Sequence, residues 1–319
     1  MQKMISCKRM LLLAGLLCFW LSSAAQAEDR VVVIPMGSAK PLQNVVTVAK
    51  GNGKFTNPVA AVNSITDASA TNPYLVLIAP GTYTLTTTLV MKPYVDISGS
   101  GENITKLTGA ISSSASLDET SAIVKGANHT TLSNLSINNT GGHTYSIGIY
   151  TTGLDFSAQM QQVLATATGG TVNFGIYNSS SSPIMTGVNV IAEGTGDGNV
   201  GVQNYNHSSP IMTEVNIVVS GGADVNHGVE NNNNSSPTMT GVNTIVSGGT
   251  TNYGVLNFMS SSPTIRRSSI AGATDGLSNI SSSTATISQS TIFNGVSGTG
   301  FTCVACDNGV GAALGAACL

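Results

Sequence analysis

A short motif recurs six times between residues 148 and 279, and no other feature restricts the fold as strongly. Each copy begins with glycine followed by an apolar residue, and most copies end in asparagine: Gly148-Ile149-Tyr150-Thr151, Gly175-Ile176-Tyr177-Asn178, Gly201-Val202-Gln203-Asn204, Gly228-Val229-Glu230-Asn231, Gly254-Val255-Leu256-Asn257 and Gly276-Leu277-Ser278-Asn279. The glycines are 27, 26, 27, 26 and 22 residues apart. A Ser-Ser-Pro block recurs in the same phase at Pro183, Pro210, Pro237 and Pro263. Repeats of this length are typical of solenoids and related arrays.

Each repeat contains short β-rich segments, such as residues 188–191 and 215–218, separated by Gly, Ser and Asn turns. No repeat has ten residues of helical periodicity, so one repeat is one coil of three short strands. Stacked coils pair each strand with the next at ~4.8 Å and align equivalent side chains. We therefore predict an all-β fold, a right-handed, single-stranded parallel β-helix with coils of about 22–27 residues. It spans residues 45–300, with clear repeats at 147–295 and one interior ladder of Met185, Met212, Met239 and Ile265.

Asparagines repeat at two positions of the motif. Three residues after the glycine stand Asn178, Asn204, Asn231, Asn257 and Asn279, and two residues before it stand Asn173, Asn199, Asn226 and Asn252. An asparagine amide can hydrogen-bond the equivalent residue of the next coil and tolerates turn geometry. We interpret both sets as structural ladders.

The N-terminus has the pattern of a secretory signal peptide: Lys3, Lys8 and Arg9, an apolar run over 10–21, then small residues ending at Ala27. We predict a signal peptide at 1–27, cleavage before Glu28 and a leader segment at 28–44. The alternative is a lipoprotein anchor at Cys18, where Leu17 replaces the small residue that such processing needs. No later stretch approaches ~18 apolar residues, so we expect an exported mature chain without a transmembrane segment, periplasmic, extracellular or at the cell surface.

The charge of the mature chain argues against nucleic acid as a partner. Three of the 12 basic residues lie in the signal peptide, which leaves nine against 15 acidic residues, and Arg266 and Arg267 are the only basic residues between positions 126 and 300. Three of the five cysteines, Cys303, Cys306 and Cys318, remain after cleavage. An exported chain can oxidise one pair and leave one thiol free.

Two segments carry a resemblance to known proteins. The first resembles the beginning of pectin-lyase-like and pectinesterase-like β-helix proteins. It comprises residues 46–56, a predicted helix at 59–65 with Val59, Val62 and Ile65 on one face, and Pro80-Gly81-Thr82-Tyr83. The resemblance implies that a short helix caps the open end of the β-helix. A capped end also blocks edge-to-edge aggregation.

The C-terminal segment 301–319 is similar to the end of secreted bacterial β-helix proteins, in which a Cys-Val start and a late cysteine close a loop. The resemblance implies a capping tail with a Cys303–Cys318 disulfide and a free Cys306, and pairing of Cys306 with Cys318 stays open. The resemblance covers most of residues 45–318 and is specific for architecture rather than activity.

The catalytic residues of the related enzymes are missing. A pectinesterase needs two aspartates with Gln and Arg, on an Asp-Phe-Ile-Phe-Gly-like strand, and the nearest fragment, Asp155-Phe156-Ser157, lacks the Ile-Phe-Gly that should follow. A pectate lyase needs an acidic calcium cluster and a basic residue. We therefore expect a protein without catalytic activity, and keep as the alternative a pectin-lyase-like hydrolase or lyase acting on a polysaccharide.

Asp197 and Asp224 are the one in-phase pair of carboxylates, each four residues before its glycine. Stacked coils would place them about one strand spacing apart, where they could act as a catalytic pair or bind Ca²⁺. The simpler interpretation is two turn residues that point to water and were duplicated with the repeat. No other cofactor is expected.

The position two residues after each glycine should face outward, because strand alternation turns the preceding residue inward. It forms a column of Tyr150, Tyr177, Gln203, Glu230, Leu256 and Ser278. Tyrosine rings and polar tips suit sugars, so we predict that Tyr150, Tyr177, Gln203 and Glu230 bind a polysaccharide or cell-envelope glycan. Two alternatives remain, namely ordinary surface residues and a purely structural or adhesive surface protein. His227 stands in a column otherwise filled by Ile147, Phe174, Val200 and Tyr253, and we interpret it as a packing residue.

Overall fold

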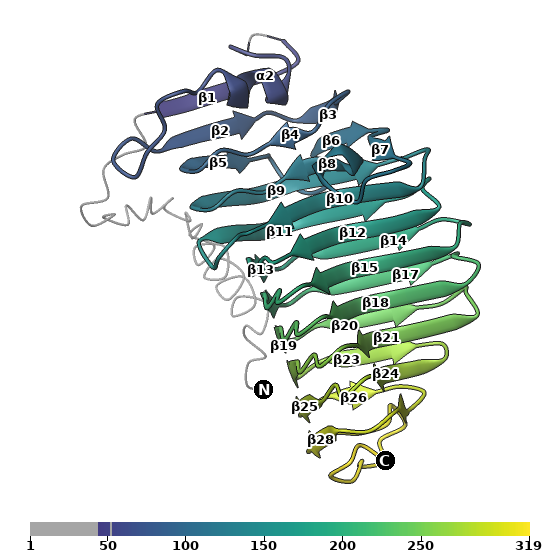
Figure 1. Cartoon of the computed structure of the whole chain (residues 1–319). Coiled ribbons are helices and arrows are strands. Elements are labelled where there is room, and N and C mark those ends of the chain that lie inside the picture. The colour runs from purple at the N-terminus through teal and green to yellow at the C-terminus, as the bar shows by residue number, and fades with distance from the viewer. Residues whose placement is uncertain (1–43, 52) are drawn as a thin grey trace, which may run out of the picture. The chain divides into compact units, whose positions relative to one another are not determined.

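The computed structural model describes residues 44–51 and 53–319. The predicted signal peptide, the Cys18 alternative and all of the predicted leader except Asn44 lie outside these residues. The described chain is a parallel β-helix of about ten coils (Figure 1). Its first coils contain the short helix α2 (Pro58–Asn63), and its last strand is β28 (Phe301–Val304). The predicted fold class is confirmed.

Three faces of stacked strands form each regular coil. The first face contains β1 (Asn44–Val48), β2 (Tyr74–Ile78), β5 (Val95–Ser98), β13 (Ile184–Thr186), β16 (Ile211–Thr213), β19 (Thr238–Thr240), β22 (Thr264–Arg266), β25 (Ala285–Ser288) and β28. The second face contains β3 (Gly81–Thr84), β6 (Thr105–Gly109), β14 (Asn189–Glu193), β17 (Asn216–Ser220), β20 (Asn243–Val246), β23 (Ser269–Gly272) and β26 (Thr291–Ile292). The long strands β9 (Thr130–Asn139) and β11 (Ala158–Ala167) cross from the first face to the second.

The third face is a separate sheet. It contains β4 (Leu89–Val90), β8 (Ala122–Lys125), β10 (Tyr145–Thr152), β12 (Val172–Ser179), β15 (Gly198–Tyr205), β18 (Val225–Asn232), β21 (Thr251–Asn257), β24 (Asp275–Asn279) and β27 (Val296–Ser297). The short strand β7 (Ser112–Ser113) pairs antiparallel with β10, and the 3-10 helix η1 (Glu119–Ser121) precedes β8. The six glycine motifs lie in β10, β12, β15, β18, β21 and β24.

The corner between the first and second faces needs one left-handed residue in each regular coil. Gln162, Gly187, Glu214 and Gly241 occupy it in successive coils with φ of 51°, 60°, 54° and 64°. This conformation is costly for residues with a side chain, whereas glycine adopts it freely. In these four coils the corner therefore alternates between strained positions that carry a long polar side chain and positions without a side chain.

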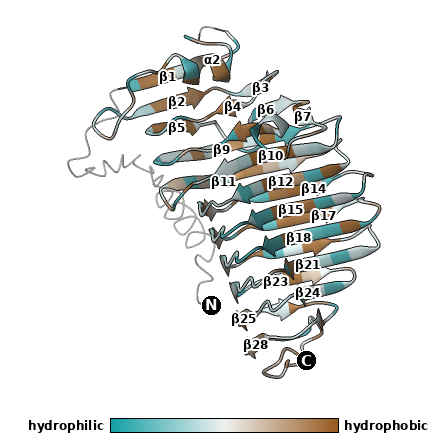
Figure 2. Ribbon diagram, in the orientation of Figure 1, coloured by the Kyte–Doolittle hydropathy of each residue, from teal (hydrophilic) through white to brown (hydrophobic). Residues whose placement is uncertain are grey.

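Apolar ladders fill the interior. Met185, Met212, Met239 and Ile265 are fully buried and pair in register, as predicted. From the third face, the residue after each motif glycine also points inward: Ile149, Ile176, Val202, Val229, Val255 and Leu277. Figure 2 shows the apolar segments recurring from strand to strand. The interior is thus a continuous hydrophobic column of the kind that stacked coils are expected to make.

Both asparagine ladders are present and buried. In the inner ladder, each Nδ2 donates to the Oδ1 of the next coil at 2.7–2.9 Å, through Asn178, Asn204, Asn231, Asn257 and Asn279. Thr151 donates to its first member, and its last donates to the carbonyl oxygen of Thr299. Asn173, Asn199, Asn226 and Asn252 form the second ladder in the same way. The predicted structural role is confirmed, because each buried amide is satisfied by its neighbours.

Both ends of the described β-helix are covered. At the N-terminal end, Asn57 accepts hydrogen bonds from the first free amides of α2, and Val62 and Ile65 are buried against the core while Val59 packs at its edge. The helix is one residue earlier at its start than the predicted 59–65 and ends at Asn63. At the other end, Cys303 and Cys318 form the disulfide, and Cys306 is buried and free. The pairing implied by the resemblance is confirmed.

Candidate functional site

The predicted column follows the outer side of the third face. Its side chains point away from the main core, and the strand register aligns them from coil to coil: Tyr150, Tyr177, Gln203, Glu230, Leu256 and Ser278. We call this set the tyrosine column. The column is much less open than expected, since Tyr150 and Tyr177 are each only 7% exposed and Gln203 is 5% exposed.

A bend at the motif glycine explains this burial. In a flat strand, residues three apart point to opposite sides. Here the Phe174 and Tyr177 rings meet edge to face with centroids 5.1 Å apart, and His227 lies within hydrogen-bonding distance of Glu230. A Cβ on Gly175 would collide with the Val190 side chain, so the glycine turns into the narrow interior and the strand folds around it.

The bend brings a second column against the first. It consists of the residues before each glycine: Ile147, Phe174, Val200, His227, Tyr253 and Asp275. We call the two columns together the two-column face. Side chains of the two columns fill the angle between them, which is why neither column stands free in solvent.

The N-terminal half of the two-column face is a second hydrophobic cluster. Ala122, Ile147, Tyr150, Phe174, Tyr177 and Val200 form it, and Leu117 packs against it from the segment before η1. The rings of Tyr150 and Tyr177 stack with centroids 5.9 Å apart and planes 14° from parallel. Burial, followed by the nearby tyrosines and Glu230, raises the pKa of Tyr177. In this half, the tyrosines mainly stabilise the fold.

The C-terminal half of the face is polar and centred on one carboxylate. Glu230 Oε2 lies 2.8 Å from His227 Nδ1, and its Oε1 accepts a hydrogen bond of 3.3 Å from Gln203. The side chains of His227 and Glu230 are 8% and 18% exposed. Burial acts to raise the pKa of Glu230, but the hydrogen bonds and charge of His227 and the bonds from Gln203 and Asn232 outweigh it and lower the pKa. The carboxylate is therefore ionised at neutral pH.

His227 is thus a buried residue, as predicted, but it does more than pack. Its ring stacks on that of Tyr253, with centroids 5.7 Å apart and planes 18° from parallel, while Nδ1 faces Glu230. The His227–Glu230 contact was not predicted, because strand alternation places residues three apart on opposite sides.

Two further residues at the edge of this polar half escaped the sequence analysis. Tyr205 and Asn232 lie four residues after their glycines and pair in register. Tyr205 is 39% exposed, which makes it the most accessible ring near the carboxylate. Asn232 donates to Glu230 at 3.4 Å, and its own Oδ1 is buried without a hydrogen-bond partner among the described residues. The signal was present in the sequence, since position four shares the outward alternation of position two.

The two aspartates considered for catalysis or calcium are at the edge of the same sheet. Asp197 and Asp224 are exposed residues of the loops before β15 and β18, and the Asp224 amide donates to the Asp197 carbonyl oxygen at 3.0 Å. Ca²⁺ takes six to eight oxygen ligands. Among the described residues, no group of three or more His, Cys, Asp or Glu side chains could hold a metal ion. The pair fits a calcium site poorly, and its catalytic role stays a prediction.

The fragment that approximates the pectinesterase strand is a turn. Asp155 accepts hydrogen bonds from the amide and hydroxyl of Ser157, which lower its pKa, and Phe156 is 50% exposed. Asp155 is engaged in holding this turn before β11.

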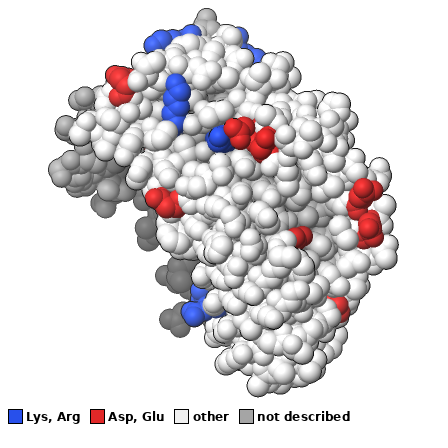
Figure 3. Space-filling view, in the orientation of Figure 1, with Lys and Arg blue, Asp and Glu red and all other residues white. Residues whose placement is uncertain are grey.

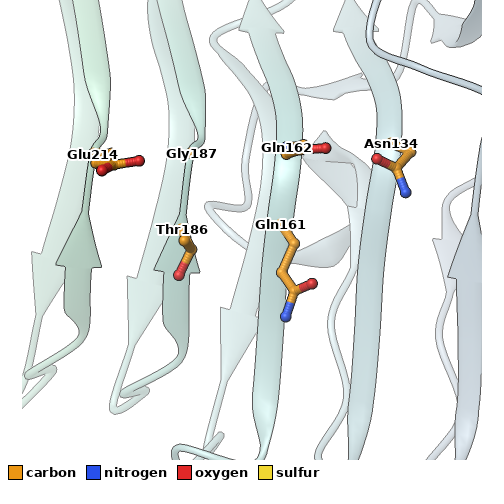
Figure 4. A pocket seen from close by; sticks show the side chains of 6 residues that line it. All are labelled: Asn134, Gln161, Gln162, Thr186, Gly187 and Glu214. Carbon is orange, nitrogen blue, oxygen red and sulfur yellow. The ribbon is translucent and has the colours of Figure 1, made fainter. Parts of the chain in front are cut away.

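A separate hollow of about 290 Å³ lies at the corner between the first and second faces (Figure 4). Gly187 leaves a gap between Gln162 and Glu214, which occupy the same corner position in the neighbouring coils. Asn134, Gln161 and Thr186 complete the lining. This hollow has one carboxylate and no aromatic ring, so the two-column face is the richer candidate for binding.

Comparison with known proteins identifies the fold class. No protein-family model matches the sequence, and no curated protein is significantly similar to it. Among solved structures, the pectin methylesterase from carrot matches 82% of this chain and 88% of its own, with 14% identity and a TM-score of 0.51. Pectin methylesterase PemA from Erwinia chrysanthemi matches 87% and 92%, with 13% identity and a TM-score of 0.48. The chain has the pectin-lyase-like β-helix fold, and at this identity the likeness extends to the fold alone.

No helix in the described part of the chain is long and apolar enough to cross a membrane. Charged side chains are sparse on the side of the molecule drawn in Figure 3.

Proposed function

We propose that the mature protein is exported and binds a polysaccharide or cell-envelope glycan along the polar half of the two-column face, without cleaving it. The ligand contacts would come from Tyr205, Gln203, Glu230 and Asn232, with Tyr253 one coil further on. Tyr150 and Tyr177 support this half from the hydrophobic cluster beside it.

The exposed ring of Tyr205 beside the polar cluster around Glu230 is the observation that carries this proposal. Tyr205 pairs with Asn232 in the strand register, and the Asn232 amide donates to the Glu230 carboxylate. An aromatic ring beside convergent hydrogen-bond acceptors is an arrangement suited to a sugar.

The absence of catalysis rests on the chemistry of the same residues. Glycoside hydrolysis requires two carboxylates ~5 to 9.5 Å apart, one of them protonated. The polar half of the face contributes two carboxylates, Glu230 and Asp275, but they stand two coils apart, or about 10 Å at ~4.8 Å per coil. The lowered pKa of Glu230 also makes it a poor proton donor. His227 occupies one oxygen of that carboxylate and is largely buried.

Calorimetric titration of the mature protein with a panel of oligosaccharides tests the proposal, with a parallel assay for released reducing ends and unsaturated products. We expect saturable binding without product. Tyr205→Ala should weaken the binding about tenfold, equivalent to about 1.4 kcal/mol.

Ile245→Ala is the matched control. Ile245 is 63% exposed and belongs to β20 on the second face, whereas the proposed site lies on the third face, which is a separate sheet. It should bind like the unmodified protein. Equal loss in both variants, or no binding of any glycan, would refute the proposal, and product release would instead favour the enzyme alternative at Asp197 and Asp224.

A further inference from the structure

We infer that the two-column face selects uncharged polysaccharides and rejects polyuronates such as polygalacturonate. This inference rests on the proposed function and specifies its ligand class. It separates the chain from what the names of its structural neighbours suggest, because pectin is built largely of uronic acid.

The charges around the face are almost all acidic. Glu230 lies in the tyrosine column and Asp275 in the second column, while Asp197 and Asp224 follow one edge. Arg266, by contrast, lies on the first face in β22.

The one lysine in line with the columns among the described residues is already paired. Lys125 precedes Tyr150 in the strand register, and its Nζ lies 3.1 Å from Glu119 Oε1. Burial raises the pKa of the Tyr150 hydroxyl, and the nearby Glu119 and Asp118 carboxylates raise it further against the effect of Lys125. Lys125 and His227 are each held by a carboxylate, so the charged groups left for a uronate to meet along the face are the carboxylates Asp275, Asp197 and Asp224.

This repulsion can discriminate between ligands. Like charges repel one another more strongly near a protein surface than in bulk water. A polyuronate carries one such charge on every sugar, so several unfavourable pairs add together. Like charges facing one another are a common means of rejecting the wrong partner.

The oxygen atoms in the polar half of the face accept few hydrogen bonds from the protein. Glu230 Oε1 accepts only two long hydrogen bonds, of 3.3 and 3.4 Å, and Asn232 Oδ1 accepts none within the described residues. A sugar hydroxyl can donate to the partly exposed Glu230 carboxylate. An uncharged sugar presents only hydroxyls there, whereas a uronate adds a negatively charged group that can only accept.

The spacing of the coils suits a polymer lying along the β-helix axis. Successive strands are ~4.8 Å apart, which is comparable to the length of one pyranose ring. Tyr205, Asn232 and Tyr253 belong to three successive coils. A chain of three or four sugars would span the polar half.

The test compares uncharged oligosaccharides with oligogalacturonates of equal length at low ionic strength, by calorimetric titration of the mature protein. We expect binding of at least one uncharged glycan and at least tenfold weaker binding of every oligogalacturonate. Glu230→Gln should narrow that ratio by weakening the uncharged ligand and strengthening the oligogalacturonate.

Glu214→Gln is the matched control, since it removes the same charge at the exposed corner between the first and second faces. It should leave the ratio unchanged. Oligogalacturonate binding as tight as that of the uncharged glycans would overturn the inference while sustaining the proposed function, as would an equal response of the two variants. If no glycan binds, both the inference and the proposed function are overturned.

Discussion

Two neighbouring positions of the same strands behave in opposite ways. The inner asparagine ladder keeps one residue type through five coils, and its members are buried and bonded to one another. The tyrosine column, one residue earlier in each strand, changes from Tyr to Gln to Glu to Leu to Ser. A buried amide must match the amides above and below it, whereas a side chain on the outer face has fewer fixed partners. Uniform columns therefore hold this fold, and varied columns are where function can reside.

Breaking the inner ladder should have the largest effect. Asn231→Ala leaves the Nδ2 of Asn204 and the Oδ1 of Asn257 buried without partners. Each unsatisfied group costs about 1–3 kcal/mol, so the free energy of unfolding should fall by about 4 kcal/mol. Urea unfolding followed by circular dichroism measures the loss.

Asn216→Ala is its matched control, because Asn216 belongs to a similar ladder on the exposed second face, between Asn189 and Asn243. Water can replace its bonds, so the loss should stay below about 1 kcal/mol. Equal losses in the two variants would show that burial of a ladder does not determine its contribution to the free energy of unfolding.

The next largest effect should be a difference in stability between variants in the two halves of the two-column face. Tyr177→Ala removes a ring from the hydrophobic cluster and should lower the free energy of unfolding by about 3 kcal/mol, as large-to-small changes in a core do. Tyr205→Ala, at an exposed ring, should cost less than about 1 kcal/mol. The same urea measurement compares them, and a larger loss for Tyr205 would contradict our division of the face.

The Glu230 carboxylate should make the free energy of unfolding depend on pH. The effect should be smaller than those above, but its direction is defined. Its pKa is lowered in the folded state, so its contribution is present above the unfolded value of about 4.5 and is lost as the pH falls through the folded value. Thermal unfolding between pH 6 and 3 should show a shallower acid loss for Glu230→Gln than for the unmodified protein.

Asp96 provides the opposite sign as a control. Its burial raises the pKa despite a hydrogen bond from the Thr131 amide, so its contribution is lost as the pH rises through the folded value. Asp96→Asn should therefore abolish the fall in stability that this group causes as the pH rises through its folded pKa. A steeper acid loss in Glu230→Gln would mean that the carboxylate is not held in its ionised form.

The smallest effect is expected for the aspartates at the edge of the sheet. Asp197→Asn and Asp224→Asn change exposed side chains and should shift the free energy of unfolding by less than about 0.5 kcal/mol. Added Ca²⁺ should leave the melting temperature unchanged. A rise with Ca²⁺ that disappears in either variant would restore the metal site to consideration.

Much of the fold could be predicted from the repeat alone. The glycine spacing predicted the coil, the Ser-Ser-Pro block placed Met185 in the interior, and the asparagines predicted both ladders. The disulfide between Cys303 and Cys318 required the family resemblance, since three cysteines allow more than one pairing. The domain boundaries at 27, 44 and 300 stay predictions.

The site was harder to predict because strand alternation fails where a strand bends. A period of two places Phe174 and Tyr177 on opposite sides, but the turn at Gly175 brings them together. The same bend produced the His227–Glu230 contact and closed the tyrosine column that we expected to be open. Exposure of Tyr205 and the unsatisfied Asn232 oxygen depend on packing between coils, which one repeat does not encode.

A single tryptophan reporter tests most directly whether the polar half binds a glycan. Trp20 is the only tryptophan of the chain and lies in the predicted signal peptide, so the mature protein should have none. In Tyr205→Trp, a bound sugar should change the indole fluorescence in a saturable manner. Phe156→Trp, at an exposed turn, should not respond. A response at position 156 but not at 205, or at neither position with a glycan that calorimetry detects, would place the binding elsewhere and contradict our account.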